Sequence, residues 1–286
     1  MDEVFGKRRV PGTGRPDQGE PPLTRPAAMT TRYTTDMTDA EWALIEPELP
    51  PPACQTPAGG RPEKHDRRRI VDAIRYITDN GAKWRALPHD FAVPWQTVYG
   101  FFARWNKLGI VEKVRDLLRA KIRVRSKRCP NAVALMIDSQ SVKASETVSK
   151  ATRGFDGGKL INGRKRHMVV DGGGLPVDVM VTAADVTDRN AARILLGRLH
   201  DAHPEIVVVW ADQGYTGELI AWAKENLGIT MIVVKRPKNA VGFVLLPKRW
   251  VVERTFGWIM RARRNVRDHE RLPATPRHTS TGPPPP

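Results

Sequence analysis

Two acidic residues each follow a run of apolar residues, and this arrangement is the first sign of chemistry in the chain. Asp138 follows the run 132–137, and Asp212 follows the run 206–211. Runs of this length are typical of strands buried on both faces, although a buried helix has the same pattern. An aspartate at the carboxyl end of such a strand lies where open α/β sheets place ligands. Asp138 alone would more readily be a strand cap, so the second aspartate carries the interpretation.

The two carboxylates predict a site for divalent metal ions. If the two strands are parallel neighbours, Asp138 and Asp212 project from one edge of the sheet, where they repel each other unless a cation lies between them. Carboxylate oxygens suit Mg²⁺ or Mn²⁺. Two such ions together activate a nucleophile and stabilise the leaving oxygen of an in-line phosphoryl displacement. We therefore expect Mg²⁺, with Mn²⁺ as a substitute and two ions in the site.

A third acidic ligand is expected from a helix packed on the sheet, and Glu253 is the best candidate. Arg249 lies four residues before Glu253, so the two share a helix face. Val252, Phe256 and Ile259 form an adjacent apolar stripe that would dock this helix on the sheet. Taken alone, the spacing is more simply an ordinary surface Arg–Glu pair. Weaker alternatives for the third acid are Glu218, Glu225, Asp268 and Glu270.

The charge balance indicates a polyanionic partner. The 286 residues include 47 Lys and Arg against 31 Asp and Glu, a formal net charge of +16. Such an excess favours nucleic acid or an anionic membrane surface. No apolar run approaches the roughly 18 residues that a membrane-spanning helix needs. Cys54 and Cys129 are far apart, so no disulfide framework is indicated. We predict a soluble, cytoplasmic protein that binds nucleic acid and no membrane.

Residues 37–125 carry the signals of a small helical domain. Thr38 begins a capping box, Asp66 caps a second helix that ends at Gly81, and Pro94 can begin a third. Helices joined by short turns in this way resemble the helix-turn-helix arrangement that binds DNA. A helical bundle without contact to a DNA groove fits the pattern equally well.

The flanks of the chain are expected to be disordered. Residues 1–36 and 273–286 are rich in proline and lack a hydrophobic period, so they cannot bury enough apolar surface to offset ordering. Met29 and Met37 are alternative starts to Met1. The tail ends in four prolines and has the character of a frameshifted end.

Residues 130–272 predict an α/β domain with a mixed sheet flanked by helices. Three strands come first, and a glycine turn at 172–174 joins the second to the third. Strands then alternate with helices, and a long basic helix runs from Pro247 to about Glu270. The strands are expected at 132–138, 164–171, 175–182, 205–212 and 229–234, and the other helices at 191–200 and 217–226.

Basic and polar residues near the acids are candidates for contact with DNA phosphates. Those on or after the first strand are Gln140, Lys143, Lys159, Arg164, Lys165, Arg166 and His167. Those on the last helix are Arg249, Arg254, Arg261 and Arg264. The basic hairpin 159–167 would be equally unremarkable as a solvated turn.

Several motifs resemble bacterial insertion-sequence transposases of the group typified by insertion sequence five. They are DSQSVK at 138–143, GFDGGK at 154–159, GRKRH at 163–167, ADQGY at 211–215 and RWVVERTF at 249–256. Segments 87–91 and 97–99 resemble the helical domain of the same proteins. The resemblance covers residues 37–272 in the same order and spacing.

The resemblance implies an RNase H-like catalytic domain of the DDE type. Asp138, Asp212 and Glu253 would be its catalytic, metal-binding triad, and Arg249 stands at the family's basic position. The implied activity is a transposase that binds terminal inverted repeats, hydrolyses phosphodiesters and transfers strands without a covalent protein–DNA intermediate. Synapsis of two DNA ends implies a homodimer, and the resemblance implies a bacterial cytoplasmic protein that is associated with the nucleoid and binds DNA.

Two other functions fit the sequence. The first is a C-terminally truncated, catalytically impaired remnant that acts only as a DNA-binding protein, which the unusual tail motivates. Leu246 also departs from the tyrosine of the superfamily signature. The second is a structure-specific nuclease of the same fold without strand transfer.

Overall fold

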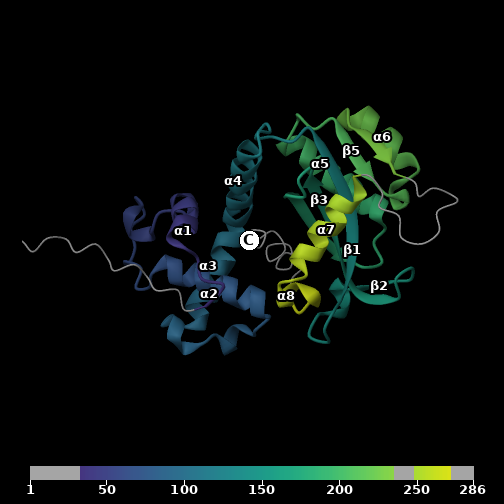
Figure 1. Cartoon of the computed structure of the whole chain (residues 1–286). Coiled ribbons are helices and arrows are strands. Elements are labelled where there is room, and N and C mark those ends of the chain that lie inside the picture. The colour runs from purple at the N-terminus through teal and green to yellow at the C-terminus, as the bar shows by residue number, and fades with distance from the viewer. Residues whose placement is uncertain (1–32, 235–247, 272–286) are drawn as a thin grey trace, which may run out of the picture.

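A computed structural model describes residues 33–234 and 248–271 of the chain. The described residues form a helical region, residues 33–125, and an α/β region that begins at residue 131 and contains the sheet (Figure 1). Helix α4, Ile110–Arg125, extends from the first region to the second. Its Arg123 donates to the carboxylate of Asp171 in a buried ion pair, which fastens the helix to the sheet.

Three helices precede α4, and local sequence signals set their ends. Helix α1, Asp39–Ile45, begins with the predicted capping box of Thr38 and Glu41. Helix α2, Arg67–Asn80, is capped by Asp66 and ends at Gly81 in the left-handed conformation. In α3, Trp95–Lys107, Pro94 occupies the cap position rather than the first helical position. Short 3₁₀ turns lie between them: η1 Glu46–Glu48, η2 Ala53–Gln55, η3 Trp84–Ala86 and η4 His89–Phe91.

The helical region has its own apolar core, which includes Ile70, Ile77, Val98 and Trp105. Tyr33 packs on this core, with its ring stacked on Phe91 at 5.0 Å. The prediction that disorder extends to residue 36 is therefore wrong at its end, because an aromatic contact offsets the cost of ordering residues 33–36. Residues 1–32 lie outside the described residues.

The α/β region contains a six-stranded mixed sheet. Its strands are β1 Ala134–Lys143, β2 Gly154–Asp156, β3 Ile161–Asp171, β4 Pro176–Ala183, β5 Val208–Ala211 and β6 Thr230–Val233. Strand β1 is antiparallel to β3 and parallel to β5, and the order is β2-β3-β1-β5-β6 with β4 also paired to β3. This is the RNase H-like mixed sheet that was expected. Two details differ: β1 continues past Asp138 to Lys143, and the short β2 was not predicted.

Helices cover both faces of the sheet because its central strands are apolar on both sides. Helices α5, Asp188–Ala202, and α6, Glu218–Leu227, pack on the face that includes Leu135 and Ile137. Helix α7, Arg249–Ile259, packs on the opposite face, against Met136 and its neighbours on β3 and β4. The η5 turn Lys150–Thr152 and the η6 turn Gln213–Tyr215 complete the region.

The last helix is shorter than predicted. It ends at Ile259, and a turn leads to α8, Arg263–Val266, which lies beside α2. Arg264 donates to the carbonyl of Ala82 at 2.8 Å and lies over the Trp84 ring. The end of α7 thus precedes a segment that contacts the helical region, an arrangement that periodicity alone could not show. Pro247 and the tail 273–286 lie outside the described residues.

Strand β3 buries the basic residues that were predicted to contact DNA. Arg164 pairs with Asp268, Lys165 with Asp188, and Arg166 donates to the Asn265 carbonyl, because buried charges need such partners. His167 is also fully buried. The prediction that Arg164, Lys165, Arg166 and His167 contact DNA is thus wrong for this structure: three of these side chains hold other parts of the α/β region together, and the fourth lies in its interior.

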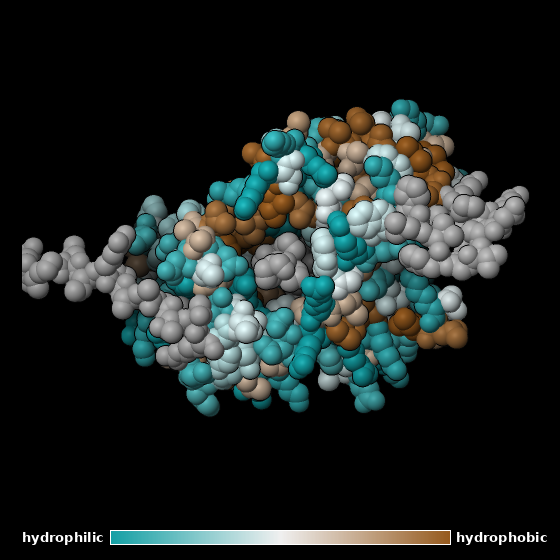
Figure 2. All heavy atoms as spheres, in the orientation of Figure 1, coloured by the Kyte–Doolittle hydropathy of each residue, from teal (hydrophilic) through white to brown (hydrophobic). Residues whose placement is uncertain are grey.

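The surface is polar over much of the face seen in Figure 2, whereas apolar residues gather over α6. None of the described helices is long and apolar enough to cross a membrane.

The buried His167 predicts acid sensitivity. Burial lowers the pKa of His167 from 6.5 to about 4, so the folded state holds a neutral imidazole. The unfolded chain takes up the proton first, so this stability is complete above pH 6.5 and is lost as the pH falls toward 4. The unfolding free energy, measured by urea denaturation, should fall between pH 7 and 4 by up to about 3 kcal/mol less in His167→Gln than in the parent. Equal acid sensitivity in His167→Gln and in the exposed control His89→Gln would contradict this.

Candidate active site

The pairing of β1 with β5 positions Asp138. Met136 is level with Trp210 in this parallel pair, and two residues further along each chain lie Asp138 and Asp212. The Asp138 side chain is 14% exposed, and its Oδ1 accepts a hydrogen bond from the Ser139 amide at 2.7 Å. Burial, assisted by the negative charge of Asp212, raises the pKa of Asp138 to about 6. The sheet therefore holds this carboxylate at a cost in solvation.

Asp212 lies directly after β5 and begins the η6 turn. Its Oδ1 accepts from the Gly214 amide at 2.8 Å, which fixes the carboxylate at the sheet edge. A Cβ at Gly214 would lie only 3.0 Å from Asp212 Oδ1 and 3.3 Å from Asp188 Oδ2. A side chain here would be in tight contact with two carboxylates, which would have to shift by a few tenths of an ångström.

Glu253 projects from α7, and the packing of that helix determines its position. Val251, Val252 and Phe256 bury one side of α7 in the core. Thr255 donates to the carbonyl of Gly174 at 2.7 Å. Gly174 has a φ of +84°, and a Cβ there would lie 2.9 Å from Thr255 Oγ1. The glycine turn between β3 and β4 thus forms part of the surface on which α7 packs.

One guanidinium group lies among the three predicted acids. Arg249 Nη2 is 3.2 Å from Glu253 Oε1, 3.9 Å from Asp212 Oδ2 and 4.0 Å from Asp138 Oδ2. The carboxylates come from a strand, a turn and a helix that are distant in sequence, yet they converge on one cationic nitrogen (Arg249). The Arg249–Glu253 spacing is therefore more than a surface pair.

Each of the three carboxylates lies near the Arg249 guanidinium, but the three do not form a close cluster of their own. Within residues 33–234 and 248–271, no three His, Cys, Asp or Glu side chains are arranged to hold a metal ion. The weaker candidates for the third acid are engaged or exposed elsewhere. Asp268 pairs with Arg164, Glu270 with Arg264, and Glu218 is almost fully exposed.

Sequence reasoning missed Asp188 and Tyr215, which border the site. Asp188 begins α5, pairs with Lys165 at 3.2 Å and lies beside Gly214. The Tyr215 ring is fully buried, and burial together with the charges of Asp138 and Asp188 raises the pKa of its hydroxyl well above 10. No pattern in the sequence separates Asp188 from an ordinary helix-start aspartate, so only the fold reveals its position.

The predicted DNA contacts fall into two groups. Lys143 and Arg261 are exposed, and the exposed Lys159 reaches the Ser139 carbonyl at 3.3 Å, next to Asp138. Gln140 lies on β1 with its Oε1 buried. Arg254 and Arg264 are half-buried and make contacts within the protein, so their role in DNA binding stays a prediction. Arg254 lies between the Trp250 and Trp258 rings, and Arg264 is held by Ala82 and Glu270.

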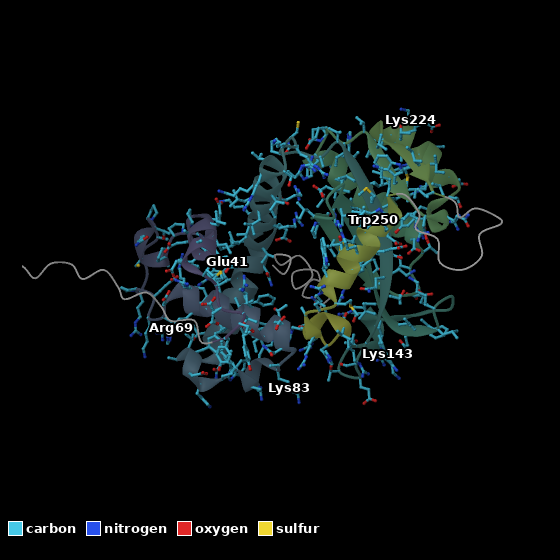
Figure 3. The ribbon with its side chains drawn as sticks, viewed as in Figure 1. Glu41, Arg69, Lys83, Lys143, Lys224 and Trp250 are labelled. Carbon is cyan, nitrogen blue, oxygen red and sulfur yellow. The ribbon has the colours of Figure 1, made fainter. Side chains whose placement is uncertain are left out.

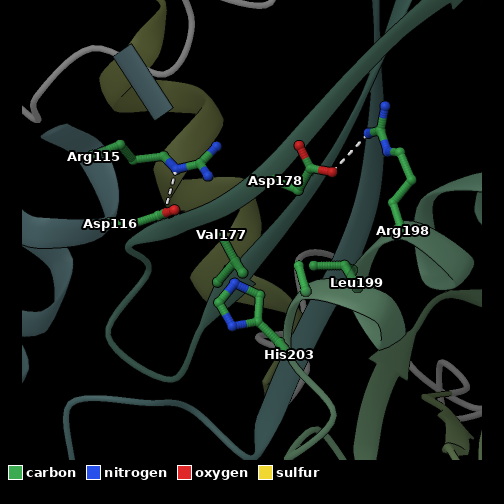
Figure 4. A pocket seen from close by; sticks show the side chains of 8 residues that line it. Arg115, Asp116, Val177, Asp178, Arg198, Leu199 and His203 are labelled. Atoms are coloured by element: carbon green, nitrogen blue, oxygen red, sulfur yellow. Dashed lines mark hydrogen bonds and ion pairs between the residues drawn. The ribbon is translucent and has the colours of Figure 1, made fainter. Parts of the chain in front are cut away.

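A cavity of about 240 Å³ lies where α4 meets β4 and α5 (Figure 4). Two ion pairs border it, Arg115 with Asp116 and Asp178 with Arg198. Its lining includes none of the three predicted acids, so it is separate from the candidate active site.

Comparisons with known proteins identify the family of the chain. Residues 37–115 match the family described as putative transposase of IS4/5 family, and residues 130–275 match the transposase DDE domain. A putative transposase for insertion sequence element IS402 of Burkholderia cepacia is 35% identical over 113 residues, covering 36% of this chain and 51% of that protein. The chain thus spans about half the length of that relative.

Two further similarities are weaker. An uncharacterized 16.2 kDa protein of insertion element IS402, also from Burkholderia cepacia, is 28% identical over 107 residues, covering 37% of this chain and 71% of that protein. A solved piggyBac transposase synaptic complex with hairpin DNA has a TM-score of 0.34 at 14% identity, covering 71% of this chain and 48% of that chain. The last similarity is too low to support an argument. The two matched families, which together take in most of the described residues, show that the chain belongs to the DDE transposases of bacterial insertion sequences.

Proposed function

We propose that this protein is a metal-dependent DNA transposase that cleaves the ends of an insertion sequence and joins them to target DNA. The observation that carries the proposal is the convergence of Asp138, Asp212 and Glu253 on one cationic nitrogen at the edge of the sheet. Membership of the DDE family supports the same three residues as the catalytic set.

The donor set fits a hard divalent cation. All three side chains offer carboxylate oxygens, which suit Mg²⁺ or Mn²⁺ better than softer metals. The position where they converge already holds a positive charge, that of Arg249. Asp138, Asp212 and Glu253 would hold the metal, for which we propose two ions. When bound, such ions activate a nucleophilic oxygen and stabilise the leaving oxygen of a phosphodiester.

The protein's own residues position the substrate. Lys159 stands next to Asp138 and is exposed, so its ammonium is available to a phosphate beside the scissile bond. Gln140 is on the same side of β1 as Asp138, two residues along the strand, and its Oε1 lacks a hydrogen-bond partner among the described residues. These side chains would orient the DNA backbone while a water molecule, and later a freed 3′-hydroxyl, attacks the phosphorus atom of a phosphodiester.

DNA binding by both regions is part of the proposal. The helical region would bind the terminal inverted repeats, in the manner of a helix-turn-helix domain, and two copies of the chain would synapse the ends as a homodimer. Lys83 of the helical region and Lys143 of β1 both lie toward the lower edge of Figure 3. Both side chains are exposed, which suits contact with DNA phosphates.

Asp138→Asn should abolish cleavage while leaving the fold intact. The amide keeps the shape and can still accept from Ser139, but it removes a charged ligand oxygen. With Mg²⁺ and a supercoiled plasmid that carries the element's ends, the initial cleavage rate should fall at least about a thousandfold.

The matched control is Asp201→Asn, which changes an exposed aspartate on α5 and should cleave like the parent. Gel-shift affinity for the same ends should be retained in both variants. Cleavage by Asp138→Asn at the parent rate would overturn the assignment, and strand transfer products would separate a transposase from a nuclease.

Lys143→Gln should weaken DNA binding without changing which sequence is preferred. Loss of one phosphate contact should lower the slope of log affinity against log salt by about one. Fluorescence anisotropy with duplex DNA at several salt concentrations measures this slope. Lys224→Gln is the control, since Lys224 lies on α6 at the opposite end of Figure 3, and its slope should equal the parent's. Equal slopes for both variants would exclude Lys143 from the interface.

A further inference from the structure

The Arg249 guanidinium lies where the three predicted acids converge. Its Nη2 is within 4.0 Å of one oxygen from each of the three acids. Mg²⁺ and Mn²⁺ bind carboxylate oxygens at about 2.0–2.2 Å, much closer than these separations. The carboxylates would therefore have to close in on an ion, and the guanidinium would lie in their way.

The contacts of Arg249 allow it to leave. Its side chain is 23% exposed, and among the described residues its one hydrogen bond is to Glu253 at 3.2 Å. Its Nε is buried and makes no hydrogen bond within the described part of the chain. Arg254 provides the contrast, because two tryptophan rings and the Gly173 carbonyl hold its guanidinium in place. Of these two arginines on one helix, only Arg249 is free of such an anchor.

We propose that Arg249 is a resident counter-cation, which compensates Asp138, Asp212 and Glu253 before metal binds and is displaced when metal enters. The inference rests on the proposed function in one respect, namely that these acids bind a divalent ion. It adds that metal and Arg249 compete for the same oxygens. A divalent ion also repels a guanidinium at this range, so the displaced side chain would turn toward an anion such as a DNA phosphate.

The competition can be measured without any activity. Mn²⁺ alone is titrated into the full-length protein, and bound ion is followed by calorimetry and by electron paramagnetic resonance. Arg249→Met keeps much of the side-chain bulk and removes the charge, so Mn²⁺ should bind about tenfold more tightly than in the parent. Arg261→Met removes an equal charge from the exposed turn that follows α7 and should leave the Mn²⁺ affinity unchanged.

Thermal unfolding gives a second readout. Without metal, Arg249→Met should unfold at a lower temperature than the parent, because three carboxylates lose their counter-charge. Saturating Mn²⁺ should raise its melting temperature more than it raises the parent's. If the variant is unfolded without metal, recovery of the fold on addition of Mn²⁺ supports the proposal, and failure to recover overturns it.

The outcomes separate this inference from the proposed function. Unchanged Mn²⁺ binding in Asp138→Asn and Asp212→Asn would refute the metal site itself. Loss of binding in those variants, with unchanged or weaker binding in Arg249→Met, would refute only the displacement of Arg249. Tighter binding in Arg261→Met as well would reduce the effect to net charge and would also overturn it.

Discussion

Like-charge repulsion between carboxylates is the constraint on which the candidate site depends. A fold that gathers three acids must supply a compensating cation, or burial and repulsion will raise their pKa values and neutralise them. Burial is the main cause of the raised pKa of Asp138, the charge of Asp212 adds to it, and the Arg249 guanidinium offsets part of it. The three acids thus carry more negative charge than the Arg249 guanidinium compensates. This arrangement suits the binding of a cation of higher charge.

Holding Glu253 in place is a matter of apolar packing and turn geometry. The aspartates belong to the sheet, where the pairing of β1 with β5 sets their register. Glu253 belongs to α7, whose inner side packs on the sheet and whose Thr255 bonds to the glycine turn. The burial of apolar surface on α7, which contributes a few kcal/mol, and one short turn therefore determine whether the Glu253 carboxylate faces those of Asp138 and Asp212.

The sequence predicted the proximity of the three acids better than it predicted their surroundings. Apolar runs ending in Asp138 and Asp212, and the stripe beside Glu253, were enough to place three acids together, because strand and helix periodicity is local information. The fate of the basic strand was not predictable from such patterns. Arg164 and Arg166 face inward only because Asp268 and the Asn265 carbonyl arrive from a distant segment to satisfy them. Asp188 was missed for the same reason, since its neighbours in space are remote in sequence.

The inward-facing arginines also explain how α7 is held at its far end. After α7 the chain turns, and Arg264 reaches the Ala82 carbonyl and the Trp84 ring of the helical region. Asp268 then returns to the sheet, where its backbone amide bonds to the Lys143 carbonyl and its carboxylate meets Arg164. The segment that follows α7 is therefore attached first to the helical region, through Arg264, and then to the sheet, through Asp268. These contacts are hydrogen bonds and ion pairs in buried surroundings, so removing one partner leaves the other unsatisfied. Several interdependent contacts among the described residues, rather than one strong bond, therefore hold α7 in place.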